Sequence, residues 1–165
     1  MTKSIHSLLV VLGIALAAPL FSRPVFGQDK AAPDVAIIVN TSNTIQNLSL
    51  EDLSSILLGR RTHWSPGRPI SLIVLPGPST TERAIVLRSA VSMDEGAYRR
   101  HWLGRIFRAE SASAPTNADS LDMIRRAIAR IPGAVGVVSL ATAGPDVKVV
   151  QIDGKLPGHP SFPLR

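Results

Sequence analysis

The sequence predicts a single α/β domain in which strands and helices alternate along the chain. Apolar runs of strand length, rich in β-branched residues, recur between segments whose apolar residues follow a helical spacing. This alternation is typical of a mixed, mostly parallel sheet flanked by helices. The chain has 165 residues, which is enough for one domain with a substantial core but not for two.

The first part of this domain has the order strand, helix, strand. Residues 35–39 form an apolar run of the kind that is buried on both faces of a parallel sheet. After a loop rich in Asn, Ser and Thr, residues 49–52 resemble a capping box that opens a helix, and Gly59 is expected to stop that helix. A polar connection then leads to a second buried strand at residues 71–75.

Two helices are expected next. Capping-box patterns at residues 79–82 and 92–95 open them, and they should end near residues 91 and 107. The aromatic residues of the second of these helices are predicted to lie in the core: Tyr98, Trp102 and Phe107.

A further helix and two strands complete the domain. The helix is marked by an apolar stripe over residues 121–131 and is stopped by Pro132 and Gly133. The strands are predicted at residues 134–140 and 147–152. The order of elements supports one α/β domain over residues 35–155, followed by a Pro-rich tail at residues 156–165.

The first 27 residues resemble a cleavable secretory signal, followed by a short tether at residues 28–34. Lys3 gives a positively charged start, and the apolar run that follows is too short and too interrupted to span a bilayer as a helix. Val25 and Gly27 predict cleavage after Gly27, by the general secretory route. The alternative is an uncleaved N-terminal anchor. Cleavage is expected to leave a periplasmic protein that is not embedded in the membrane.

Composition narrows the possible partners. The chain has no cysteine, so it has neither disulfides nor a thiolate metal site, and the histidines lack the spacing of a metal motif. No metal and no cofactor is therefore predicted. The formal net charge is +6, but outside the cytoplasm nucleic acid is not an expected partner. A small anion or a membrane surface fits better.

The most informative local feature is a turn that carries three consecutive hydroxyl side chains into a helix start, Ser79, Thr80 and Thr81. Hydroxyl groups beside the unpaired N–H groups of a helix N-terminus suit phosphate or a similar oxyanion. The alternative is ordinary helix capping. Glu82 suits a capping box but repels an anion.

Other candidate sites each have a structural alternative. Trp64, in a loop with Arg60, Arg61 and Arg68, indicates either a surface that receives an anion or partner, or an aromatic side chain that closes the core. The run of residues 99–101, Arg-Arg-His, indicates a solvated helix face or a contact with anionic lipid. A hydrolase built on Ser79 is disfavoured, because the surrounding sequence is not a nucleophile elbow.

Several segments, in this order along the chain, resemble the phosphate-type periplasmic solute-binding proteins of ABC importers. They are NLSLEDLSSILLG at residues 47–59, the Trp64 that follows, the strand that ends in a Gly/Ser/Thr turn, PGAVGVVS at residues 132–139, Asp153-Gly154, and SFPLR at residues 161–165.

The resemblance implies one three-layer lobe of the type 2 periplasmic-binding fold. Transferred residue by residue, its phosphate turn falls on Gly77, Ser79, Thr80 and Thr81. Pro78 replaces a glycine of the family's turn, and the chain is about half as long as a two-lobed binding protein.

The expected function is therefore that of an exported, noncatalytic solute-binding-like protein that holds phosphate or a similar oxyanion weakly. A membrane transporter or sensor is its implied partner. The alternative is a ligand-free interaction or scaffold module of the same fold, acting with a partner in the cell envelope.

Overall fold

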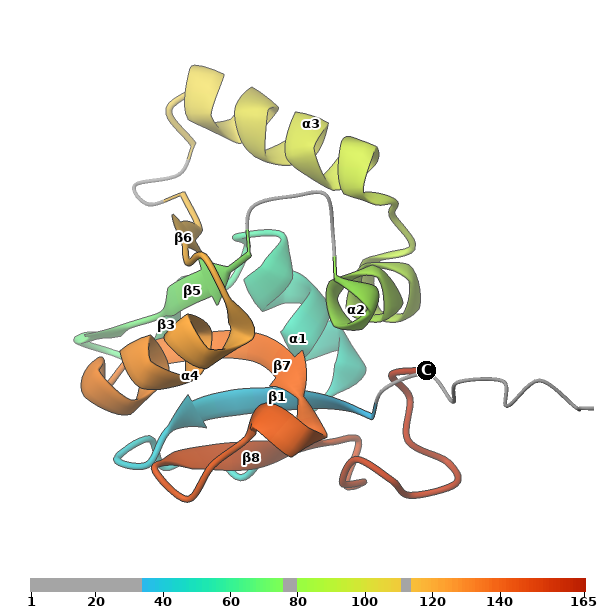
Figure 1. Ribbon diagram of the computed structural model, residues 1–165. Coiled ribbons are helices and arrows are strands. Elements are labelled where there is room, and N and C mark those ends of the chain that lie inside the picture. Colours follow the sequence, from blue (N-terminus) through green and yellow to red (C-terminus); the bar gives the residue numbers. More distant parts are fainter. Residues whose placement is uncertain (1–33, 76–79, 111–113) are drawn as a thin grey trace, which may run out of the picture. The chain divides into compact units, whose positions relative to one another are not determined.

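The protein is described by a computed structural model that covers residues 34–75, 80–110 and 114–165 (Figure 1). The predicted export signal, and residues 28–33 of the predicted tether, lie outside the described residues. No helix among those residues is long and apolar enough to cross a membrane.

A mixed six-stranded sheet forms the middle of the domain, with the strand order β2-β8-β1-β7-β5-β6. Three of its five pairings are parallel and two are antiparallel. The strands are β1 (Val35–Asn40), β2 (Asn47–Leu48), β5 (Ser71–Val74), β6 (Thr116–Asn117), β7 (Ala134–Ser139) and β8 (Val147–Ile152). The predicted mixed, mostly parallel sheet is confirmed.

The central strand β1 is buried along its whole length, as its apolar run predicts. Its two neighbours, β7 and β8, nevertheless run antiparallel to it. The prediction that the strands beside β1 run parallel to it was therefore wrong. A strand covered on both faces needs apolar residues on both sides whatever the direction of its neighbours, so its composition could not distinguish the two cases.

Helices cover both faces of the sheet, which gives the three layers that were expected (Figure 1). On one face α4 (Leu121–Arg130) packs with Ile124 and Ile128 against Ala36 and Ile38 of β1. On the other face α1 (Leu50–Leu57) and α2 (Thr81–Val91) share a core with the remaining apolar side chains of β1. Alternation along β1 thus distributes its side chains between two cores.

Two helix starts differ from the expected ones. The N-cap of α2 is Thr80 rather than Ser79, and the N-cap of α3 (Glu95–Phe107) is Asp94 rather than Ser92. Ser92 instead ends α2 in the left-handed conformation, with φ 53°. An N-cap residue adopts extended backbone angles, so Ser92 cannot also begin the next helix.

A short hairpin, β3 (His63–Ser65) and β4 (Arg68–Pro69), lies in the segment expected to be a polar connection. Its few residues are mostly polar and exposed, so no apolar alternation announced it. A single 3-10 turn, Leu140–Thr142, follows β7.

Helix α3 packs across the carboxyl end of α1. The Tyr98 hydroxyl (2.8 Å) and the Trp102 indole Nε1 (3.2 Å) both donate to the Leu57 carbonyl oxygen. Gly59 has φ +69°, and a Cβ atom there would lie 2.6 Å from the Trp102 ring. Glycine is thus required at this position both by its backbone angle and by the close ring.

The next turn of α3 continues the same contact. His101 Nε2 lies 3.0 Å from the Leu58 carbonyl oxygen, so the tautomer protonated at Nε2 donates to it. Arg105 Nη2 donates to the Gly59 carbonyl oxygen at 3.2 Å. The last carbonyl groups of a helix have no partner within the helix, and α3 supplies donors for those of α1. The inner face of α3 is therefore the stripe of residues 98, 101, 102 and 105.

The expectation that all three aromatic residues of α3 lie in the core is wrong for Phe107. Tyr98 and Trp102 are buried, but Phe107 is 86% exposed. Each residue turns the helix by about 100°, so Phe107, two residues after Arg105, lies on the side of α3 opposite the inner face.

Candidate functional site

The site that the sequence singled out lies where β5 leads into α2. Gly77 and Ser79, two of its four predicted residues, lie outside the described residues. The other two are at the start of α2: the Thr80 hydroxyl accepts a hydrogen bond from the Arg83 backbone N–H at 3.4 Å, and Thr81 is exposed. The structure therefore places two hydroxyl groups at the N-terminus of an eleven-residue helix.

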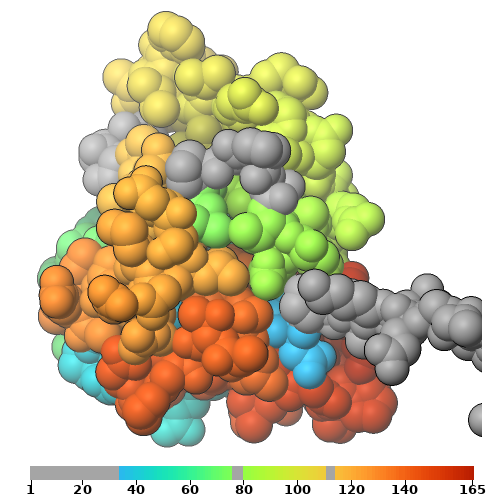
Figure 2. All heavy atoms as spheres, viewed as in Figure 1, coloured from blue at the N-terminus to red at the C-terminus, as the bar shows by residue number. Residues whose placement is uncertain are grey.

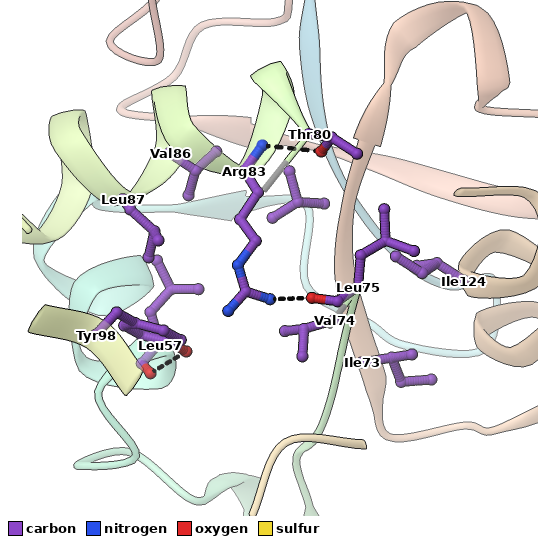
Figure 3. A pocket seen from close by; sticks show the side chains of 11 residues that line it. Leu57, Ile73, Val74, Leu75, Thr80, Arg83, Val86, Leu87, Tyr98 and Ile124 are labelled. Atoms are coloured by element: carbon purple, nitrogen blue, oxygen red, sulfur yellow. Dashed lines mark hydrogen bonds between the residues drawn. The ribbon is translucent and has the colours of Figure 1, made fainter. Parts of the chain in front are cut away.

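The nearest cation, Arg83, is fully engaged in other contacts. Its Nη1 donates to the Leu75 carbonyl oxygen at 2.5 Å (Figure 3). Its Nε and Nη2 each donate to the Glu95 carboxylate at 2.8 Å. The guanidinium carbon also lies 5.2 Å from the centre of the Tyr98 ring. This arrangement ties the end of β5 to α3 and leaves Arg83 electrically compensated by Glu95.

Glu82 sits beside this pair in the first turn of α2, and it is buried. A carboxylate there suits the helix dipole but repels an anion at the helix N-terminus. With Arg83 neutralised and Glu82 close by, the site has no free cation in its described part. An oxyanion there would depend on neutral donors, namely hydroxyl groups and backbone N–H groups.

Beneath Arg83 lies a small cavity of about 20 Å³, with mostly apolar walls from the sheet, α2 and Tyr98 (Figure 3). A cavity of this size holds about one water molecule. An anion therefore has no room inside the lobe here and would have to bind at its surface.

A larger groove, of about 400 Å³, opens between α3 and the carboxyl end of β5. Apolar side chains form most of its wall: Val74, Leu75, Tyr98, Trp102, Leu103, Ile106 and Pro115. Burial raises the pKa of Tyr98 to about 12, so its hydroxyl stays protonated at neutral pH and continues to donate to Leu57. This groove was missed at the sequence level, because it forms between elements that are distant in sequence.

The second predicted candidate, around Trp64, belongs to the core. Trp64 is buried, and its Nε1 donates to the Gly133 carbonyl oxygen at 2.9 Å. Arg61 lies over the indole ring and pairs with Asp52 at 2.7 Å. Of the two alternatives for this segment, closure of the core is the one that these contacts support.

The described residues hold no cluster of three or more His, Asp or Glu side chains that could bind a metal ion. Their histidines also form no nucleophile–base–acid arrangement. His63 contacts the neighbouring Thr62 hydroxyl, His101 contacts a backbone carbonyl, and His159 accepts from a backbone N–H. Ser79, the serine considered as a nucleophile, lies outside the described residues.

Solved structures show what this arrangement is similar to. An ABC-type phosphate transport receptor from Vibrio cholerae is 21% identical with a TM-score of 0.59, and the match covers 76% of this chain and 48% of the receptor. A protein from Clostridium perfringens, described as a phosphate ABC transporter substrate-binding protein with bound phosphate, is 17% identical with the same TM-score, covering 74% and 46%. A phosphate binding protein from Stenotrophomonas maltophilia is 22% identical with a TM-score of 0.51, covering 76% and 40%.

The chain has the periplasmic-binding-protein fold. The resemblance to phosphate-type solute-binding proteins, which the sequence indicated, is confirmed for the fold. The chain spans about half the length of these proteins, as expected for a single lobe. No protein-family model and no curated protein matches the sequence.

Two features of the site escaped the sequence analysis. The Arg83–Glu95 pair joins two helices, and spacing in the sequence does not reveal such a pair. The exposure of Leu103 could have been found, because it lies away from Tyr98 and Trp102 on a helical projection, whereas Ile106 lies only about 40° from Trp102 and lines the same groove.

Proposed function

We propose that the protein is a noncatalytic, single-lobe relative of the phosphate-binding proteins, which holds phosphate or a similar oxyanion weakly at the N-terminus of α2. The observation that carries this proposal is the position of Thr80 and Thr81. They lie at the start of α2, the next helix along the chain after the parallel strand β5, in a fold of which one solved example has bound phosphate. Ligands of open α/β sheets commonly bind at the carboxyl ends of the strands.

The electrostatics of the site favour weak binding. Arg83 is compensated by Glu95, and Glu82 adds a negative charge, so neutral donors would carry the anion. The single lobe also provides one wall rather than two closing walls. We expect millimolar rather than micromolar affinity, because a few neutral hydrogen bonds at an exposed surface contribute about 1 kcal/mol each.

Calorimetric titration with inorganic phosphate and sulfate tests this proposal. Thr80→Ala should weaken phosphate binding by about 1 kcal/mol, roughly fivefold, if the hydroxyl bonds the anion. Ser120→Ala is a matched control, because Ser120 caps α4 in the same way, with its hydroxyl 3.1 Å from the Met123 N–H. Both variants lose a helix cap, which costs about 1 kcal/mol of stability, but only the first should lose phosphate affinity.

Glu95→Gln sharpens the same experiment. It removes the charge that compensates Arg83 and should therefore tighten phosphate binding, in the opposite direction to Thr80→Ala. No binding heat with the unaltered protein at millimolar phosphate, or equal affinities for Thr80→Ala and Ser120→Ala, would contradict the proposal and leave Thr80 as an ordinary cap.

Export is part of the same proposal. We expect the protein to pass through the general secretory route, to lose residues 1–27 and to reside in the periplasm. The mass of the protein recovered from the periplasmic fraction tests this. A protein that retains Met1, or one confined to the cytoplasm, would contradict it.

A second candidate is an interaction module of the same fold that has no small ligand. The observation that favours it is the apolar surface of α3, where Leu103, Ile106 and Phe107 are exposed. An envelope partner would cover this surface. The two candidates differ in the calorimetric titration, which only the first predicts to give heat.

A further inference from the structure

The outward face of α3 carries an unusual combination of side chains. Leu103 is 47% exposed, Ile106 48% and Phe107 86%. Two exposed arginines, Arg99 and Arg100, precede them on the same face. Spacings of three, four and seven residues join the five positions into one stripe of the helix, and one edge of this stripe, with Arg99, Leu103 and Ile106, also lines the groove beside β5. We call this stripe, residues 99, 100, 103, 106 and 107, the α3 outer face.

The opposite face of the helix holds this surface in place. Tyr98, Trp102 and Arg105 donate to carbonyl groups at the carboxyl end of α1. Arg83 adds a two-bond ion pair to Glu95 at the first turn of α3. Helix α3 therefore cannot rotate to bury its outer face without breaking these contacts, and its apolar side chains stay exposed.

The charge of the outer face is positive and uncompensated. Among the described residues, no carboxylate forms an ion pair with Arg99 or Arg100. By contrast, Arg108, just beyond the face, pairs with Glu110. A surface that joins exposed arginines to exposed Leu, Ile and Phe side chains matches both parts of an anionic bilayer, the headgroup charge and the acyl region beneath it.

The shape of the lobe at α3 is compatible with a flat partner. Helix α3 forms one end of the lobe and its outer side is convex, as Figure 2 shows for the yellow and yellow-green atoms at the top of the view. A planar surface can therefore reach the helix along its length. We propose that the α3 outer face is a peripheral membrane-binding surface, specific for bilayers with anionic phospholipid headgroups, which holds the lobe on the membrane with α3 lying in the interface.

Vesicle co-sedimentation tests the proposal. The protein is used in its exported form, with its N-terminus defined by mass spectrometry and identical in all variants. It should bind vesicles made of phosphatidylcholine and phosphatidylglycerol. Its binding to vesicles of pure phosphatidylcholine should be weaker by roughly tenfold or more. Phe107→Ala should weaken binding by about tenfold while leaving the melting temperature unchanged, because the side chain is exposed.

Two double charge reversals distinguish binding through the α3 outer face from binding through net charge alone. Arg99→Glu with Arg100→Glu should reduce binding to the anionic vesicles by more than about tenfold. Arg88→Glu with Arg130→Glu changes the net charge by the same amount at exposed positions on α2 and α4. This second pair should reduce vesicle binding by no more than about threefold.

The proposal is overturned by any of three results: no binding to anionic vesicles, equal losses in the two charge-reversed proteins, or unchanged binding by Phe107→Ala. It is also overturned if the unaltered protein forms a dimer that Phe107→Ala dissociates, because the face is then covered by a second copy. Phosphate titration is independent of these measurements, so loss of vesicle binding and loss of oxyanion binding are separately observable.

Discussion

Helices α3 and α4 contain similar residues but use them differently. Helix α3 has one isoleucine and α4 has two, and each helix has three arginines. In α4 the isoleucines Ile124 and Ile128 are buried against the sheet, and Arg125 and Arg126 pair with acidic residues. In α3 the isoleucine Ile106 is 48% exposed, and hydrogen-bonding side chains make the contact with α1 instead.

This difference indicates which helix is structural and which is available for a partner. Helix α4 places its apolar stripe in the core and pairs two of its three arginines, Arg125 and Arg126, with acidic residues, so less of it is available for a partner. Met123 is its exposed apolar side chain. Helix α3 is anchored by polar contacts and exposes apolar and cationic side chains together, a combination that costs solubility and is more readily explained by recognition than by folding.

The largest expected effect comes from the same substitution made in both helices. Ile128→Ala should destabilise the protein by about 2–5 kcal/mol, because Ile128 is fully buried and leaves a cavity. Ile106→Ala should change the free energy of unfolding by no more than about 0.5 kcal/mol, because that side chain is half exposed. Urea denaturation monitored by tryptophan fluorescence measures both.

Equal destabilisation by the two substitutions would show that Ile106 is packed in solution, and the α3 outer face would then be part of a folded interface. Gly136→Ala is a second check of the α4 side. A Cβ atom at that position would lie 2.7 Å from an Ile124 methyl group and 2.9 Å from Ile128, so overpacking should destabilise the protein by about 1–3 kcal/mol.

Much of the fold could be predicted from the sequence, because the signals are local. The apolar run of β1, the Ser49 cap and Gly59 stop of α1, and the stripe of α4 each lie within one element. The antiparallel direction of the two neighbours of β1 could not be predicted, since it depends on how distant elements pair. The start of α3 was misplaced because Ser92 and Asp94 are both good capping residues, and the end of α2 decides between them.

The candidate site was less predictable. The hydroxyl residues at the start of α2 formed a visible motif, but the charge around them depends on Arg83 and Glu95, which belong to different helices. The orientation of α3 depends on carbonyl groups of α1, about forty residues earlier in the chain. Phe107 was assigned to the core because its residue type favours burial. Only the contact between α3 and α1 shows that Phe107 lies on the other side of its helix.

A smaller effect is expected from the inner face of α3. Tyr98→Phe removes the hydrogen bond to Leu57, whose carbonyl oxygen keeps the Trp102 donor, so the cost should be about 1–2 kcal/mol near neutral pH. The unaltered protein should also lose stability as the pH rises from 10.0 to about 12, since the unfolded chain releases the Tyr98 proton first. Tyr98→Phe should lack this alkaline loss.

Absorbance of the phenolate measures the titration directly, because the chain contains one tyrosine. We expect the folded protein to titrate near the raised pKa of about 12. Titration at the ordinary pKa of 10.0 would mean that the inner face of α3 is not packed in solution. The outer face would then have no fixed orientation.

The smallest effect is expected on the charged side of α4. Hydrogen bonds from Arg125, and the nearby Arg126, lower the pKa of Asp122. The resulting stability is present above the pKa of this carboxyl group in the unfolded chain and is lost as the pH falls through its lower value in the folded protein. Asp122→Asn should therefore flatten the acid limb of the melting-temperature profile, whereas Asp119→Asn, at an exposed carboxylate before α4, should leave it unchanged.

High salt should diminish the difference between the two variants, because the ion pairs of Asp122 are exposed to solvent. If the two variants have the same acid profile, the arginines of α4 are as free as those of α3, and the charge contrast between the helices is lost.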